Sequence, residues 1–239
     1  MSFPSARFWW LSIAALAGLV ITLALGMWQL SRAEQKLALQ SLMDQRASLA
    51  ALEGSALDAA ALAQDALYRP ALLRGRWLAS HTVYLDNRQM NAKSGFFVLT
   101  PLQLDDSATT VLVQRGWVQR DFNDRSRLPA LATEPGLVEI RGRIAPAPSK
   151  LYEFAAESGG AIRQNVDLDA FSREIGVALA PWSLQQTGPA AGGLLREWPQ
   201  IDTGVAKHHG YAFQWFALSG LIAFLYGWFQ IVRRSHKTT

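Results

Sequence analysis

The 239-residue chain contains no cysteine, so it can form no disulfide framework, no cysteine-ligated metal centre and no thiol nucleophile. It also lacks the glycine-rich phosphate loops, the G-x-S-x-G turn of hydrolases, the H-E-x-x-H metal motif and the EF-hand pattern. Of its four histidines only His81 lies in the middle of the chain, and a single histidine forms no catalytic triad. These absences predict that the protein is not an enzyme and has no catalytic residues.

Charged residues are scarce, at 18% of the chain, and the positive excess is confined to the two ends. Residues 37–200 hold 16 Lys/Arg and 17 Asp/Glu, whereas the rest of the chain holds 7 Lys/Arg and 2 Asp/Glu. A near-neutral middle with basic flanks is typical of a membrane protein, and there is no basic stripe that a phosphate backbone could follow. We therefore expect the lipid bilayer among the partners of the protein, and no nucleic acid.

Two long runs contain no Lys, Arg, Asp or Glu. Residues 8–31 form a run of 24 and residues 208–232 a run of 25. As helices of about 36 Å, both would be longer than the roughly 30 Å core of a bilayer, so we predict two transmembrane helices. For the first run a cleaved signal peptide is the alternative, with Ala24-Leu25-Gly26 as the cleavage site, since small residues stand at its first and third positions.

The segment between the two runs sets the expected orientation. It contains about 175 residues, well above the roughly 60-residue limit below which loop charge governs translocation. We therefore place residues 1–7 and the tail 233–239 in the cytoplasm, and residues 32–207 on the other side of the membrane.

Residues 32–66 are rich in Ala, Leu, Gln and Glu with apolar positions at helical spacing, which predicts helix with a break near Gly54 and Ser55. Residues 68–187 instead contain short runs of Val, Thr, Trp and Phe between turn signals, which predicts a β-rich domain. The fold class is therefore membrane α+β: a two-helix transmembrane hairpin flanking one β-rich extracytoplasmic domain.

Seven short strands predict a sandwich or a partly closed barrel. A short helix at 168–175 follows a cap at Asp167 or Asp169, and the GPAAGG stretch at 188–193 predicts a flexible tether. The strands are expected at 70–78, 81–86, 95–103, 109–118, 137–145, 162–166 and 182–187.

The start of the second apolar run carries a histidine, and an ionisable group entering hydrocarbon is costly unless it is paired or ligated. At spacings of three and four, one helix face would combine an imidazole, a phenol and an indole, and its residues are His208, Tyr211, Ala212, Trp215 and Ser219. Such a face could hold a flat ligand.

The end of the first run carries a second stripe at similar spacing, formed by Trp28, Gln29, Arg32 and Lys36. In an antiparallel hairpin both stripes lie at the same membrane level. His208 could then bind a haem iron while the two cations bind the haem carboxylates. The alternative is that the aromatic residues only anchor the helices at the interface and the cations only flank them.

In the strand at 109–118 the alternation places Arg115 on the same face as two valines and Trp117. Either Trp117 covers the arginine stem or this face meets a partner. Because Arg and Trp dominate interface hot spots, we predict Arg88, Arg115 and Trp117 as partner contacts if the protein works through protein binding.

Six short motifs, taken in order, resemble the Surfeit locus protein 1 family and extend over nearly the whole chain. They are GMWQLSRAEQK (26–36), RGRW (74–77), LDNR (85–88), GFFVLTPL (95–102), VLVQRGWV (111–118) and HHGYAFQWFALSG (208–220). The chain departs from the family at residues 205–207, because many members carry an asparagine just before the histidines.

The resemblance implies an inner-membrane assembly factor for haem-copper cytochrome c oxidase, with two transmembrane helices and a large domain outside the cytoplasm. It further implies that haem a is bound, with His208 as the iron ligand and His209 as the adjacent candidate. We therefore expect a two-pass protein of the inner (plasma) membrane with a periplasmic domain, which delivers haem a to the catalytic subunit of the oxidase and works with other assembly factors. The alternative is a haem-independent scaffold that stabilises an oxidase assembly intermediate through the β-rich domain.

Overall fold

The computed structural model describes residues 6–53, 57, 66–105, 107–124, 127–152, 160–198 and 204–232. The chain divides into two compact units. One unit, Met1–Leu42 with Ile201–Thr239, contains a helix pair, and the other, Met43–Gln200, contains a β-sheet domain.

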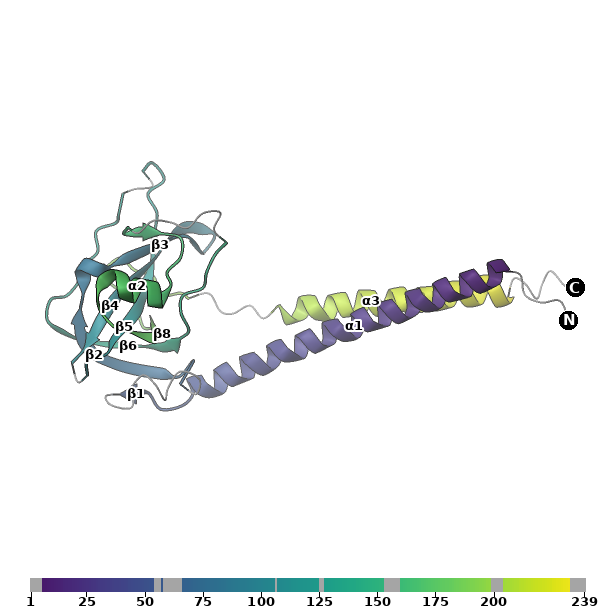
Figure 1. The fold of residues 1–239 in the computed structure, drawn as a ribbon, viewed down its shortest axis with the longest axis horizontal. Helices are drawn as coiled ribbons and strands as arrows, with labels where there is room; N and C mark the ends of the chain where they lie inside the picture. The colour runs from purple at the N-terminus through teal and green to yellow at the C-terminus, as the bar shows by residue number, and fades with distance from the viewer. Residues whose placement is uncertain are drawn as a thin grey trace, which may run out of the picture. The chain divides into compact units, whose positions relative to one another are not determined.

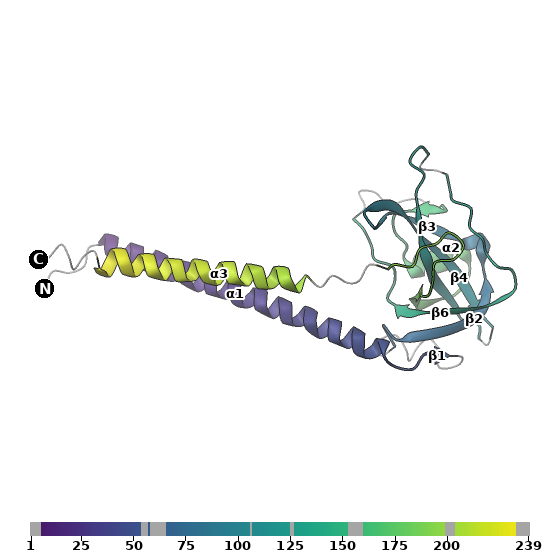
Figure 2. The ribbon, with the colours of Figure 1, turned by 180° about the vertical axis from the view of Figure 1, so that it is seen from behind.

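The helix pair consists of α1 (Ala6–Ala47) and α3 (Val205–Tyr226), and α3 continues into the π-helical segment η3 (Gly227–Val232). Figures 1 and 2 show α1 and α3 lying side by side. Both helices are long and apolar enough to cross a membrane, by length and composition. The uncharged runs of the sequence therefore correspond to helices, as predicted.

Small and polar residues form the contact between the helices. Thr22, Gly26 and Ala33 of α1 are buried, as are Ala212 and Ser219 of α3. Small side chains allow two backbones to approach closely, which is the usual basis of helix pairing where lipid supplies no hydrophobic drive.

The region after the first apolar run differs from the prediction. The predicted helix is confirmed over residues 32–47, but α1 ends at Ala47, and β1 (Leu52–Glu53) pairs in parallel with β2 (Pro70–Trp77). At residues 52 and 53 strand pairing overrides the local helical propensity, because tertiary hydrogen bonds outweigh local preference. The predicted break at Gly54 and Ser55 lies outside the described residues.

Each of the seven predicted strands corresponds to a strand of the domain. The remaining strands are β3 (Val83–Met90), β4 (Lys93–Leu104), β5 (Thr110–Gln119), β6 (Leu137–Ala145), β7 (Ile162–Arg163) and β8 (Leu179–Gln186). A short 3-10 helix, η2 (Ala79–His81), separates β2 from β3.

The strands form one sheet in the order β1-β2-β6-β8-β5-β4-β3-β7, and β2 also pairs with β4. The second pairing of β2 closes β2, β6, β8, β5 and β4 into a ring. Within the ring only β5 and β8 run parallel. Of the two predicted architectures, the structure therefore has the barrel (Figure 2).

The core of the barrel contains Trp182, Leu73 and Leu184, each at most 1% exposed. The helix α2 (Leu168–Ile175) begins where predicted, and Asp167 caps it by accepting a hydrogen bond from the Ala170 amide. Phe171 of α2 packs into a second apolar cluster with strand residues of β3, β4 and β5.

The predicted tether at 188–193 is wrong. Gly192 and Gly193 have positive φ angles of 60° and 79°, which form the turn between Ala191 and Leu194. Leu194 is buried, and Leu195 pairs with Trp117 through two backbone hydrogen bonds. The glycines therefore build a turn that packs onto the barrel instead of a flexible linker.

Candidate functional site

At the end of the helix pair where His208 lies, a hydrogen bond joins the two helices. α3 begins after Gly204, which has a left-handed conformation (φ 59°), and His208 lies in the first turn of the helix. His208 Nδ1 lies 2.7 Å from Gln29 Oε1, although the two residues are 179 positions apart in the chain. The structure thus brings together two residues that the sequence predicted to lie at one site.

This hydrogen bond has a direction that matters for ligand binding. Gln29 Oε1 carries no hydrogen, so it must accept, and His208 Nδ1–H must donate. In a neutral imidazole the lone pair then resides on Nε2. Histidines that bind metals are usually held in this way, with one ring nitrogen donating to a neighbour and the other facing the metal.

The cations of the site lie on α1, one and two turns beyond Gln29. Arg32 stacks its guanidinium 5.6 Å from the ring centre of Trp28 and donates a 3.1 Å hydrogen bond to Gln35. Lys36 is half-buried. Both cations therefore follow Gln29 along the helix at the spacing of one stripe.

The aromatic residues do not all face the partner helix. Trp28 and Tyr211 are each about half exposed, at 51% and 52%, and Trp215 is half-buried. His208, Ala212 and Ser219, at spacings of four and seven, form the face of α3 that points to α1. Tyr211 consequently lies on the flank of that face, and in the described part of the chain no hydrogen bond joins it to His208.

A haem needs a nitrogen ligand for iron, flat apolar surfaces for the porphyrin and cations for its carboxylates. The described residues supply the Nε2 of His208, the exposed rings of Trp28 and Tyr211, and two cations on the adjacent stripe. They contain no group of three His, Cys, Asp or Glu side chains that could hold a bare metal ion. The residues of this helix end therefore fit a haem held through one histidine.

The three predicted partner contacts lie inside the domain. Trp117 is 2% exposed, Arg88 4% and Arg115 7%. Arg88 donates hydrogen bonds to the backbone carbonyls of Ser149 and Gln164. Side chains buried in their own domain cannot meet a partner directly, so their burial argues against the predicted role.

Arg115 shows why an arginine shares a face with apolar residues. Its guanidinium lies 4.7 Å from the ring centre of Trp77 and donates hydrogen bonds to Thr133 Oγ1 and the Ala132 carbonyl. Burial lowers the pKa of Arg115, an effect that the nearby Tyr84 phenol opposes. Of the two interpretations of this face, the structure favours the one in which an aromatic ring covers the arginine, although the ring is that of Trp77.

His81 ends η2 and is half-buried, and its backbone amide bonds to Leu78. Among the described residues no hydrogen bond links its side chain to a carboxylate, as a catalytic pair would need.

Residues 16–220 match the model of the SURF1 family. The SURF1-like protein of Rickettsia bellii (strain RML369-C) is 27% identical over 232 residues, which cover 93% of this chain and 90% of the relative. The SURF1-like protein of Drosophila melanogaster is 28% identical, with 89% of this chain and 75% of the relative covered. A shorter match, 26% identical over 43% of this chain and 26% of the relative, is to the cytochrome oxidase assembly protein SHY1 of Saccharomyces cerevisiae.

Proposed function

Because the chain belongs to the SURF1 family, we propose that it is an assembly factor for haem-copper cytochrome c oxidase, whose helix pair binds haem a and delivers it to the catalytic subunit. The family membership agrees with the resemblance carried by the six sequence motifs. The assembly role is supported by the name of the Saccharomyces relative, a cytochrome oxidase assembly protein.

In this proposal α1 and α3 cross the inner membrane, both termini are cytoplasmic and the barrel domain is periplasmic. Only 6% of the most apolar stretch of α1 and 11% of that of α3 is buried within the protein. Such extended apolar surface is costly in water and favourable in lipid. Ser12 contacts Tyr226 and Gly26 contacts Phe216, so cleavage after residue 26 would remove both contacts.

The observation that carries the haem proposal is the 2.7 Å hydrogen bond between Gln29 and His208. Gln29 holds the imidazole so that Nε2 remains available to iron, and Arg32 and Lys36 supply positive charge for the carboxylates. A bound haem would supply the iron–nitrogen bond, which is the strongest contact of the complex. One histidine ligand at an exposed helix end gives a site from which a cofactor can be released, as delivery requires.

The test uses the full chain purified from cells that make haem a. We expect a Soret band in the wild type and in His209→Ala, since His209 is adjacent but exposed, and its loss in His208→Ala. A pyridine haemochrome spectrum identifies the type of haem. Equal Soret absorbance in wild type and His208→Ala would refute ligation by His208.

A haem-independent scaffold is the second candidate, and an exposed aromatic residue of the domain favours it. Phe122 is 72% exposed and borders a surface hollow of about 580 Å³ formed by the loop after β5. Exposed aromatic side chains beside a hollow are common at protein interfaces. If Phe122→Ala lowers oxidase co-purification while His208→Ala leaves oxidase activity normal, the scaffold is the correct function.

A further inference from the structure

A groove of about 570 Å³ lies at the opposite end of the helix pair from His208, between the first turns of α1 and the last turns of α3 with η3. Leu11, Leu225 and Phe229 in its walls are each roughly half exposed, so the groove opens to the surroundings of the helices. Its apolar walls are formed by Leu11, Ala14, Ala15, Ile222, Leu225 and Phe229.

The polar groups of the groove are unevenly placed. The phenol of Tyr226 is 2.7 Å from Ser12 Oγ, so the hydroxyl that lies between the helices is already paired. The other polar lining residues are Arg7, in the first helical turn, and Gln230, near the end of η3. The groove therefore has an apolar body and a polar end that carries a positive charge.

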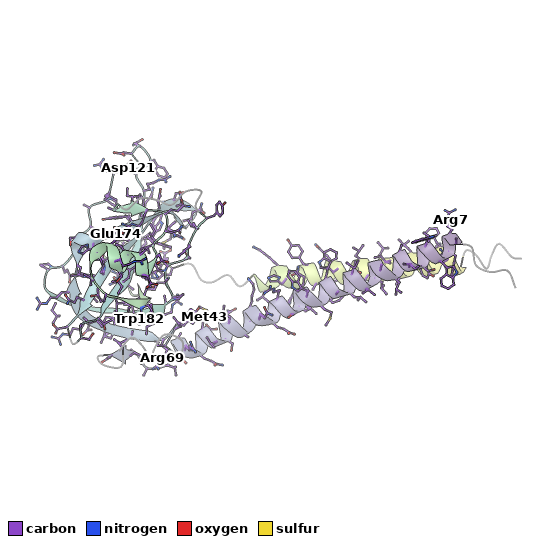
Figure 3. All side chains as sticks on the ribbon, in the orientation of Figure 1. Arg7, Met43, Arg69, Asp121, Glu174 and Trp182 are labelled. Carbon is purple, nitrogen blue, oxygen red and sulfur yellow. The ribbon has the colours of Figure 1, made fainter. Side chains whose placement is uncertain are left out.

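No carboxylate balances this charge in the part of the chain that the structure describes. The first turn of α1 contains no acidic residue, and none of the ion pairs among the described residues includes Arg7. Figure 3 shows the Arg7 side chain at the end of the helix pair. In the sequence, three more cations follow closely after Gln230, at positions 233, 234 and 237.

We propose that this groove binds one anionic glycerophospholipid, with an acyl chain along the apolar walls and the phosphate at Arg7. The apolar walls match a hydrocarbon chain, and a cation in the headgroup layer attracts anionic lipid. A neutral lipid would gain only the first of these contacts. This lipid site rests on one part of the proposed function, the crossing of the bilayer by the two helices. It does not depend on haem binding.

The test is the motional restriction of spin-labelled lipids, measured by electron paramagnetic resonance on the full chain in phosphatidylcholine vesicles. We expect spin-labelled phosphatidylglycerol to associate about fivefold more strongly than spin-labelled phosphatidylcholine, as one cation near an anionic headgroup provides. Arg7→Gln should reduce that ratio, and any preference that is left would come from the cations at positions 233, 234 and 237. Lys207→Gln, which removes an exposed cation at the other end of α3, should leave it unchanged.

A second variant tests the apolar body of the groove. Ala15→Phe fills the groove and should reduce the restricted phosphatidylglycerol, whereas Ala24→Phe, on an exposed part of the same helix outside the groove, should not. Equal association of the two lipids with the wild type, or a preference that is unchanged in both Arg7→Gln and Ala15→Phe, would overturn the lipid site. An absence of any restricted lipid would instead show that the helices do not cross the bilayer.

Discussion

The indole Nε1 of Trp117 donates a 2.9 Å hydrogen bond to the backbone carbonyl oxygen of Arg88. The bond connects β5 to β3, although β4 lies between them in the sheet. The ring crosses β4 at Gly95, where a Cβ atom would come within 2.5 Å of the indole. Glycine at this position therefore makes the connection possible, and three strands are fixed to one another by one side chain.

Replacing Trp117 by Phe should destabilise the domain through this hydrogen bond. The Arg88 carbonyl would lose its partner in a buried setting, which costs about 1–3 kcal/mol in the free energy of unfolding. Trp182→Phe is the matched control, because Trp182 is 1% exposed and its Nε1 has no hydrogen-bond partner. Urea unfolding of the full chain in detergent, monitored by circular dichroism, measures the free energy of unfolding of both variants. Equal losses in the two variants would show that the hydrogen bond contributes nothing.

Replacing Gln29 by Leu should weaken haem binding while His208 is still present. The imidazole loses the acceptor that fixes its orientation, and loss of such an outer partner lowers metal affinity roughly 10–100-fold. Gln40→Leu is the control, since Gln40 is an exposed glutamine of the same helix that lies outside the predicted site. Haem titration of the purified proteins gives the affinities. Wild-type affinity in Gln29→Leu would mean that the hydrogen bond has no role in the site.

Gly26→Leu should separate the two helices. Even a Cβ atom at Gly26 would lie 2.5 Å from the Phe216 ring, so a larger side chain forces the ring or the helix to move. At Gly18 the nearest atom, in Ile222, is 3.4 Å away, so Gly18→Ala should be tolerated. Because the chain has no cysteine, one cysteine can be introduced on α1 and one on α3 to carry spin labels. Electron paramagnetic resonance then measures the distance between the two labels. An unchanged distance in Gly26→Leu would contradict the contact.

Protonation of Glu174 should make the domain less stable in acid. Its carboxylate accepts two 2.9 Å hydrogen bonds from Arg163, and these lower its pKa below the ordinary value of 4.5. The unfolded chain therefore takes up a proton at a higher pH than the folded chain does. The stabilisation is complete above the ordinary pKa and is lost as the pH falls towards the folded pKa.

Glu174→Gln should accordingly flatten the loss of stability between about pH 5 and pH 3. Arg163→Gln should flatten it to the same extent, and the double variant should add nothing further. Denaturation at a series of pH values measures the stability of the two single variants and of the double variant. A pH dependence that is identical in wild type and Glu174→Gln would show that the pair does not couple stability to pH.

The elements that the sequence predicts well are those with a strong local signal. Long runs without charge correspond to α1 and α3, and the strand ranges follow from β-branched and aromatic residues between turns. The start of α2 follows from Asp167, whose side chain caps the helix. These signals lie within a few residues of the structure they determine.

The elements that the sequence misses depend on distant partners. β1 forms because Leu52 and Glu53 pair with Ala71 and Leu72, which no local pattern reveals. The burial of Arg115 depends on acceptors in the loop after β5, at Ala132 and Thr133. Patterning alone recognises an arginine on an apolar face but not what covers it.

At the helix end the spacing of the sequence was informative but incomplete. It placed Gln29 and His208 at one site, where they lie 2.7 Å apart. The predicted face of α3 included Ala212 and Ser219, which are buried, but it was too broad, because it also included Tyr211, which is 52% exposed. The contact face became clear only from the burial of these small residues.

The closed ring of β2, β6, β8, β5 and β4 limits how another protein can recognise the domain. Each ring strand has neighbours on both sides, so the ring offers no open strand edge to which a peptide from a client could add. Recognition of the ring itself must then use loops and surface side chains, whereas the strand edges of the sheet lie outside the ring, at β1 and β7.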